Sequence, residues 1–228
     1  MSLYAIADPH LSFGTDKPMD IFGGWSGYVD RLTANWQAKI RPEDTVVIAG
    51  DISWGMTLED AYPDLAYLHR LPGRKILLKG NHDYWWSTRK KLDAFLAEKE
   101  LSTLNILFND SYEYEDISIC GSRGWVYEGG SAPDKLVLAR EAGRLVLSLD
   151  HAAKSGKPPI VFLHYPPVYG DYVAEEIMDV LLRYGITRCY YGHLHSSAVK
   201  KAIQGNYMGI DFRLISGDSI QFDPVKIL

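Results

Sequence analysis

The sequence predicts an α/β fold with a parallel or mixed β-sheet, and two observations carry this prediction. Short runs rich in Val, Ile and Leu recur along the chain, each closed by Gly, Pro, Asp or His, and such runs are typical of buried strands. Between the first of them lie longer segments with apolar residues at helical spacing, such as Leu58, Ala61, Leu65 and Leu68. Strands that alternate with helices are usually joined by right-handed crossovers into a parallel sheet.

In the first half of the chain, strands and helices alternate regularly. Strands are expected at residues 3–7, 45–49 and 75–79, and helices at residues 28–38, 57–71 and 87–99. Ser87 is the expected N-cap of the third helix, because a serine side chain can accept a hydrogen bond from the first turn. The segment at residues 12–27 is rich in Gly, Asp and Pro and is expected to form a loop.

The second half of the chain is expected to be more varied. Short strands at residues 104–108, 112–114 and 117–121 are separated by Asn-Asp and Glu-Asp turns, which predicts an antiparallel patch. A loop is expected at residues 123–135, followed by helices at 136–153 and 174–184 and strands at 160–163 and 187–191. Hairpin strands at residues 207–209 and 212–215 are expected to close one sheet edge.

Composition limits the class of protein. The chain has 228 residues, of which 46% are hydrophobic and 23% charged, so we expect one globular domain spanning residues 1–228. Its net charge of −5 and pI of about 5.8 argue against a non-specific nucleic-acid binder, which usually shows a basic face, so no stable nucleic-acid binding is expected. A nucleotide substrate stays compatible with this charge, because a bound metal ion inverts the local field.

The cysteines and the apolar segments indicate the compartment. Cys120 and Cys189 lie in strand-like contexts, which favours two buried free thiols over a disulfide, and the absence of a CxxC pair excludes a thiolate zinc site. No stretch approaches the ~18 consecutive apolar residues of a membrane span. Because the chain begins with strand-like residues and no signal-peptide pattern, we expect a cytoplasmic protein without a membrane segment.

Polar residues that can bind metal follow five of the expected strands. The set comprises Asp8, His10, Asp51, Asn81, His82, His164, His193 and His195, and it includes five of the seven histidines. A single histidine in such a place is most often a packing residue. Repetition at strand ends favours a functional site, because active sites of α/β sheets lie at the carboxyl ends of strands.

The chemistry of these donors predicts two metal ions. Pro9 is expected to hold Asp8 extended, and alternation along an extended segment would send Asp8 and His10 toward one metal. Imidazole, carboxylate and amide donors together suit Mn, Fe or Zn better than Ca. The set supplies more ligands than one ion needs, which predicts two metals about 3.5–4 Å apart that share a carboxylate, as in enzymes that attack phosphorus in line.

The same residues fall in motifs that resemble a known family. In chain order, the motifs Asp8-x-His10, Gly50-Asp51, Gly80-Asn81-His82-Asp83, His164 and Gly192-His193-x-His195 resemble the full motif set of the calcineurin-like metallophosphoesterases. The chain looks most like the small uncharacterised bacterial phosphohydrolases of that superfamily. The resemblance implies a four-layer α/β/β/α sandwich of two mixed sheets flanked by helices.

The resemblance also implies roles for the motif residues. Asp8, His10 and His195 would hold a first metal, Asn81, His164 and His193 a second, and Asp51 would bridge the two. The implied cofactors are two divalent ions or a mixed pair of Fe and a divalent ion, with Mn favoured and Zn or Fe as alternatives. The implied activity is phosphoester hydrolysis, in which a metal-bridging hydroxide attacks phosphorus in line and His82 assists the leaving group.

One position departs from the family pattern. In its phosphoprotein phosphatases, an Asp three residues after the bridging Asp orients the catalytic histidine, whereas Trp54 stands there in this chain. His82 is therefore expected to be oriented by another group, such as a backbone carbonyl. A phosphoprotein phosphatase and a non-catalytic scaffold are the alternative functions, and the complete ligand set with His82 favours an enzyme.

Arg123 and Trp125, just past an expected strand, are the candidate substrate-binding residues. The Arg123 guanidinium either binds a phosphate in bidentate fashion or forms a surface salt bridge. Aromatic residues near the motifs either stack a flat group or pack the rim; these are Trp54, Tyr84, Trp85, Trp86, Trp125, Tyr165 and Tyr169. We expect a small phosphoester substrate, with a phosphodiester or nucleotide-like compound favoured over a phosphomonoester.

Overall fold

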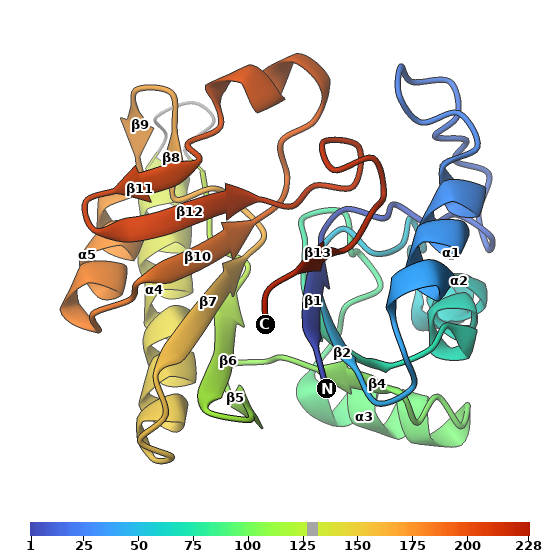
Figure 1. The fold of residues 1–228 in the computed structure, drawn as a ribbon, viewed down its shortest axis with the longest axis horizontal. Helices are drawn as coiled ribbons and strands as arrows, with labels where there is room; N and C mark the ends of the chain where they lie inside the picture. The colour runs from blue at the N-terminus through green and yellow to red at the C-terminus, as the bar shows by residue number, and fades with distance from the viewer. Residues whose placement is uncertain (127–131) are drawn as a thin grey trace.

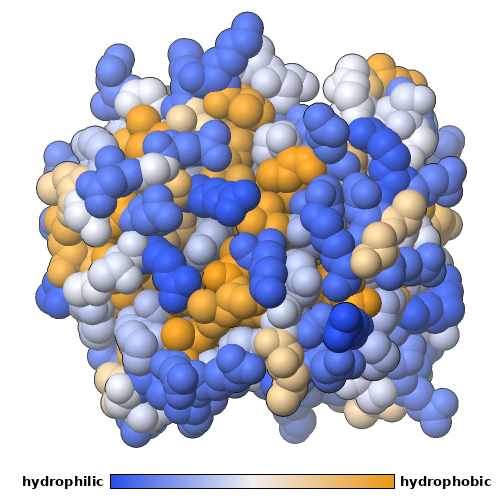
Figure 2. All heavy atoms as spheres, viewed as in Figure 1, coloured by the Kyte–Doolittle hydropathy of each residue, from blue (hydrophilic) through white to orange (hydrophobic). Residues whose placement is uncertain are grey.

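Two β-sheets pack face to face, and helices cover the outer face of each sheet (Figure 1). This computed structural model describes residues 1–126 and 132–228. The order of layers is helix, sheet, sheet, helix, which confirms the predicted four-layer α/β/β/α sandwich of two mixed sheets. In the same view, hydrophilic residues cover most of the surface, and hydrophobic residues are visible near the centre between the two halves (Figure 2).

The first sheet contains five strands in the order β13–β1–β2–β3–β4. Their bounds are β1 Leu3–Ile6, β2 Thr45–Ala49, β3 Arg74–Leu78, β4 Leu104–Ile106 and β13 Val225–Lys226. Strands β1 to β4 are parallel, and β13 pairs antiparallel with β1. The helices α1 Tyr28–Lys39, α2 Leu58–Arg70 and α3 Arg89–Glu98 pack their buried stripes on its outer face.

The second sheet contains six strands in the order β11–β12–β10–β7–β6–β5. Their bounds are β5 Ser111–Tyr114, β6 Ile117–Ser122, β7 Pro159–Leu163, β10 Arg188–Tyr191, β11 Gly205–Tyr207 and β12 Ile210–Leu214. The four central strands are parallel and both edge strands are antiparallel. Helices α4 Ala132–Ala153 and α5 Glu175–Arg183 cover the outer face of this sheet. A separate hairpin pairs β8 Val168–Tyr169 with β9 Tyr172–Val173, and a 3₁₀ helix, η1, spans Ser196–Lys201.

An apolar layer fills the space between the two sheets. It includes Val47, Ile76, Ile119 and Phe162, all almost completely buried, and Phe162 stacks on Tyr190 with ring centroids 5.3 Å apart. Each sheet is thus covered on both faces, by helices outside and by the other sheet inside. Strands buried on both faces read as continuous apolar runs, which is why the central strands are so clear in the sequence.

One of the expected strand arrangements is wrong, and one strand was not expected. Strand β4 pairs parallel with β3 in the first sheet, so only β5 and β6 form the antiparallel patch that was expected to include it. Leu104 and Ile106 explain the difference, because their side chains are buried in the core beneath α3. The antiparallel partner of β1 was not predicted at all, since β13 has only two paired residues.

Helix boundaries follow the expected ranges with local shifts. Thr88, and not Ser87, caps α3, and its hydroxyl accepts a hydrogen bond from the Lys91 amide at 3.4 Å. Helix α4 begins at Ala132, inside the loop expected at residues 123–135, and residues 127–131 of that loop lie outside the described residues.

Both cysteines agree with the expectation of free thiols, since Cys120 and Cys189 are buried and unpaired. Among the helices of residues 1–126 and 132–228, none is both long enough and apolar enough to cross a membrane.

We expect Phe162→Ala to lower the free energy of unfolding by about 3–5 kcal/mol, because it opens a cavity between the sheets. Leu147→Ala is the matched control: Leu147 lies on α4 and is 53% exposed, so this substitution should change stability by less than about 0.5 kcal/mol. Urea unfolding of chelator-treated protein measures both values. Equal effects of the two substitutions would contradict the assignment of the inter-sheet layer.

Candidate dinuclear metal site

All the predicted metal ligands lie just beyond the carboxyl ends of strands from both sheets. Asp8 and His10 follow β1, Asp51 follows β2, Asn81 follows β3, His164 follows β7, and His193 and His195 follow β10. Backbone contacts join these ends across the inter-sheet boundary, since Ala7 bridges to Ser216 and the Ala7 amide donates to the Ile215 carbonyl at 2.8 Å. The site is therefore built where the two sheets meet.

The backbone around the ligands is unusual. Asp8, His10, Asp51 and His193 have φ of 57°, 41°, 51° and 71°, in the left-handed region. The expectation that Pro9 holds Asp8 extended is therefore wrong, although Asp8 and His10 do reach the same site. This conformation costs roughly 1–2 kcal/mol per non-glycine residue, and such strain is concentrated at functional sites.

Two glycines allow the ligand loops to approach one another closely. A Cβ atom on Gly80 would overlap the backbone nitrogen and carboxylate of Asp51. A Cβ atom on Gly192 would overlap the Ala7 side chain and the Asp8 carboxylate. The glycine preceding Asn81 and the one preceding His193 are therefore required by the packing of the site itself.

The first group of ligands comprises Asp8, His10 and His195, whose donor atoms all lie within 4.8 Å of one another. Asp8 Oδ1 lies 3.7 Å from His195 Nε2, and both atoms are buried without a hydrogen-bond partner. Unpartnered buried polar atoms are costly, so this pair marks a place where a cation would be stabilised.

The second group comprises Asp51, His164 and His193, again with donor atoms within 4.8 Å of one another. The Asn81 side chain joins it, since its Oδ1 lies 2.6 Å from His164 Nε2 and 3.0 Å from His193 Nδ1. Asp51 also faces the first group, with Oδ2 3.5 Å from His10 Nε2. The Asp51 carboxylate thus lies between the two groups.

Charge is unbalanced in this buried cluster. Burial and the neighbouring charge of Asp8 raise the pKa of Asp51 well above its usual range. Burial and the charge of His164 lower the pKa of His193 to about 3, so its imidazole is held in the neutral form that binds metals. Burial alone would lower the pKa of His195, but Asp8 and a hydrogen bond to Asp218 raise it to about 10.

These residues fit a pair of first-row metal ions. Carboxylate, imidazole and amide donors converge in two adjacent groups, and Asp51 is available to both. The tautomers also fit: His164 Nδ1 lies 3.1 Å from the carbonyl oxygen of Ala49, to which it donates, so Nε2 keeps its lone pair toward the site.

Asp218 is a site residue that the sequence did not reveal. Its Oδ1 accepts a hydrogen bond from His195 Nδ1 at 2.7 Å, and its Oδ2 accepts one from the Ser196 amide at 3.1 Å. A carboxylate behind a ligating histidine fixes the ring and raises its basicity. Asp218 lies in an irregular segment after β12 with no motif around it, so only the fold could identify it.

Asp83, the last residue of the motif Gly80-Asn81-His82-Asp83, has a structural role. This fully buried carboxylate accepts hydrogen bonds from the amides of Gly80, Ile52 and Ser53 at 2.7, 2.8 and 3.2 Å, and from the Trp85 indole at 3.0 Å. It therefore ties the loop after β2 to the loop after β3.

His82 lies beside the two groups. Its amide donates to Asp51 Oδ1 at 2.8 Å, and its ring centroid lies 5.6 Å from that of His10. The expected backbone carbonyl is not its partner among the described residues. Instead the ring packs on Trp54 with centroids 4.4 Å apart, and Nδ1 lies 3.4 Å from the Tyr84 hydroxyl.

The two candidate substrate residues lie beside the ligands and not among them. Arg123 Nη2 donates to Glu141 Oε1 at 3.1 Å, which is the salt-bridge alternative, although it lies in a cavity and not on the open surface. The guanidinium stacks over the Trp125 ring at 4.9 Å. Of the other aromatics, Trp85 is buried core, whereas Tyr84 is 53% exposed.

Comparisons with known proteins agree with this architecture. The chain matches the calcineurin-like phosphoesterase family over residues 1–197. The fold is similar to that of the protein of unknown function AQ665 from Aquifex aeolicus, with 17% identity, a TM-score of 0.53 and coverage of 99% of this chain and 95% of that chain. It is also similar to that of phosphopantetheinyl hydrolase (PptH) from Mycobacterium tuberculosis, with 16% identity, a TM-score of 0.54 and coverage of 100% of this chain and 95% of that chain. No protein with a curated description matches the chain.

The family match covers most of the chain and includes every predicted metal ligand. Members of this family use dinuclear metal centres, and the two ligand groups around Asp51 are the corresponding candidate in this chain. The chain therefore belongs to the calcineurin-like phosphoesterase family and is a metal-dependent phosphoesterase.

Proposed function

We propose that the protein hydrolyses a small phosphoester at a dinuclear metal centre, with a phosphodiester or nucleotide-like substrate favoured over a phosphomonoester. The observation that carries this proposal is the position of Asp51 between two groups of buried donor atoms, with Asn81 completing the second group. Asp8, His10 and His195 would hold one ion, Asn81, His164 and His193 the other, and Asp51 would contact both.

Two divalent ions bound there would neutralise the phosphoryl oxygens and lower the pKa of a water molecule into the working range. The chain's own residues supply orientation and proton transfer. His164 and His195 are held by the Ala49 carbonyl and the Asp218 carboxylate, so their rings cannot rotate freely. The His82 side chain is half-buried at the rim and belongs to neither ligand group, which leaves its imidazole available to give a proton to the leaving oxygen.

The preference for a flat leaving group rests on the aromatic residues at the rim. Trp54 packs on His10 and His82, and Tyr84 is exposed beside His82. An exposed ring next to the group that protonates the leaving oxygen favours a leaving group with its own flat surface, such as a base or an aryl ring.

We expect chelator-stripped protein to be inactive and to recover phosphoester hydrolysis on reconstitution, with about two metal ions bound per chain. Separate reconstitution with Mn, Zn, Ni and Fe, assayed on an aryl phosphodiester and on the matching monoester, identifies the metal and the preferred ester. Failure to bind more than one metal ion would contradict the dinuclear centre. Higher turnover of the monoester would contradict the substrate preference alone.

We expect His82→Ala to retain both metal ions and to lose turnover by roughly 10²–10⁴-fold, the usual contribution of general acid catalysis. His151→Ala is the control, because His151 is an exposed histidine on α4 whose side chain hydrogen-bonds only to Ser111 among the described residues. Loss of metal from the His82 variant would assign His82 as a ligand and not as an acid.

We expect Asp218→Asn to weaken the affinity for one of the two metals by roughly 10–100-fold, because the His195 ring loses its carboxylate partner. Competition with a metal chelator measures both affinities. Asp211→Asn, at an exposed position of β12, should leave both unchanged. Equal loss at both metals would show that Asp218 supports the fold of the site as a whole and not His195.

A further inference from the structure

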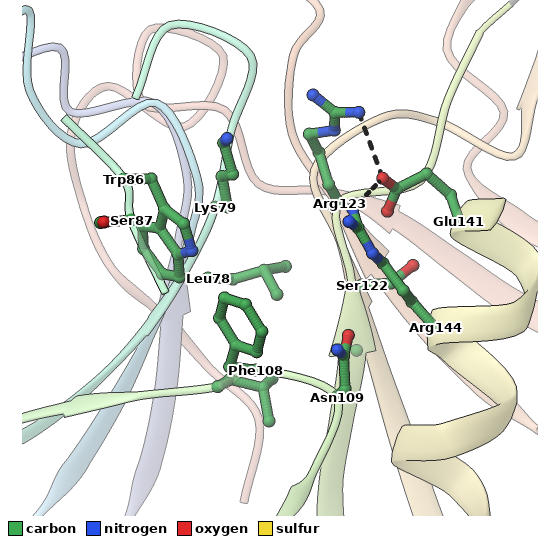
Figure 3. A pocket seen from close by; sticks show the side chains of 12 residues that line it. Leu78, Lys79, Trp86, Ser87, Phe108, Asn109, Ser122, Arg123, Glu141 and Arg144 are labelled. Atoms are coloured by element: carbon green, nitrogen blue, oxygen red, sulfur yellow. Dashed lines mark hydrogen bonds and ion pairs between the residues drawn. The ribbon is translucent and has the colours of Figure 1, made fainter. Parts of the chain in front are cut away.

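A cavity lies beside the metal site, between the carboxyl ends of β3 and β6 and helix α4 (Figure 3). Lys79 and Trp86 line one side, and Arg123 and Arg144 line the other with Glu141 behind them. We call this the cationic cavity. None of the residues assigned to metal binding or proton transfer lines it.

The two arginines of the cationic cavity keep N–H donors that Glu141 does not use. Glu141 is fully buried, and a single one of its oxygens, Oε1, accepts from both Arg123 Nη2 at 3.1 Å and Arg144 Nη1 at 2.5 Å. One carboxylate thus orients two guanidinium groups, each of which carries five N–H donors. Arg123 Nε is buried without a hydrogen-bond partner.

Lys79 adds a third cation from the opposite wall. Among the described residues, no acceptor lies within hydrogen-bond or ion-pair distance of its amine. Lys79 and Arg123 line opposite walls, so the two cations face the same cavity (Figure 3). Three cations facing one carboxylate leave a local excess of positive charge in a chain whose net charge is −5.

The cationic cavity is connected to the second group of metal ligands. Lys79 is two residues before Asn81, and the Arg123 carbonyl accepts hydrogen bonds from the amides of His164 and Tyr165 at 3.2 and 2.9 Å. The Tyr165 ring in turn packs on His193 with centroids 4.3 Å apart. A ligand in the cavity would therefore lie next to a substrate held at Asn81, His164 and His193.

We propose that the cationic cavity binds a second anionic group of the substrate, a phosphate or a carboxylate, through Lys79, Arg123 and Arg144, while the ester to be cleaved lies at the metal site. This inference rests on the proposed function and narrows its substrate to phosphoesters that carry a further anion. Trp86 and Phe108, whose rings are nearly parallel, give the cavity an apolar wall for the carbon skeleton that joins the two groups.

Charge and geometry both favour an anion over an apolar ligand. Guanidinium groups bind phosphate and carboxylate through paired N–H donors, and partial burial strengthens the attraction. The Arg123 guanidinium is already oriented for anion binding. Its side chain is 17% exposed, forms an ion pair with Glu141 and stacks over the Trp125 ring.

The proposal is tested with metal-reconstituted protein. Its hydrolysis of alkanediol bisphosphates of increasing chain length is compared with its hydrolysis of alkyl monophosphates of the same length. We expect one chain length to show a kcat/KM at least roughly tenfold above its monophosphate, the value of one charge-assisted hydrogen bond. Lys79→Met and Arg144→Met should each remove this preference through KM. Lys154→Met, which removes an exposed charge just after α4, should keep it. A parallel series of carboxyalkyl phosphates shows whether phosphate or carboxylate is preferred.

Calorimetric titration of inorganic phosphate into the chelator-stripped protein separates this proposal from the proposed function. Binding that weakens roughly tenfold in Lys79→Met but not in Lys154→Met supports the cationic cavity even if no ester is hydrolysed. Hydrolysis of esters without any preference for a second anion, together with phosphate binding that is independent of Lys79, would overturn the cavity proposal and leave the phosphoesterase intact.

Discussion

Buried carboxylates control the architecture of this protein at the boundary between its two sheets. Asp8 and Asp51 lie side by side with almost no exposure to solvent, and each accepts a backbone amide from a neighbouring loop: His193 N to Asp8 at 2.9 Å and His82 N to Asp51 at 2.8 Å. Asp83 accepts four further donors from the loops after β2 and β3. A buried carboxylate is stabilised by the hydrogen bonds it accepts, so the loops take the conformations that bring their amides to it; a cation would satisfy Asp8 Oδ1, which accepts none. The left-handed residues and close-packed glycines of the site follow from this requirement.

The apolar layer between the sheets and the polar cluster at its end depend on each other. Phe162, Val47 and Ile76 set the distance between the sheets, and this distance decides whether donors from β1–β3 and from β7 and β10 can reach a common point. In turn, the hydrogen bond from the Gly192 amide to the His164 carbonyl and the bridge between Ala7 and Ser216 join the strand ends next to that layer. Neither sheet contains a complete ligand group by itself: the first group needs His195 and the second needs Asp51.

Local patterns in the sequence identified most of the strands and all the candidate ligands, because both signals are contained in a few consecutive residues. The run 45–49 followed by Gly50-Asp51 is an example: continuous apolar residues indicate a doubly covered strand, and the polar residue marks its carboxyl end. Features that depend on distant partners could not be predicted in this way. Asp218 is identified only by its contact with His195, β13 only by its pairing with β1, and Glu141 only by the two arginines that share one of its oxygens. The conformation of Asp8 was mispredicted because tertiary hydrogen bonds override the local preference imposed by Pro9.

The division of each ligand group between two sheets has a thermodynamic consequence. An ion that binds such a group binds only the assembled sandwich, so its binding free energy is added to the free energy that holds the sheets together. By linkage, a ligand that binds only the native state stabilises it by RT ln(1 + [L]/Kd), about 2.7 kcal/mol when its free concentration is 100 times Kd. Metal supply is thus a variable of the folding equilibrium as well as of the chemistry. In a cell short of the preferred ion, the population of assembled protein would fall together with its activity.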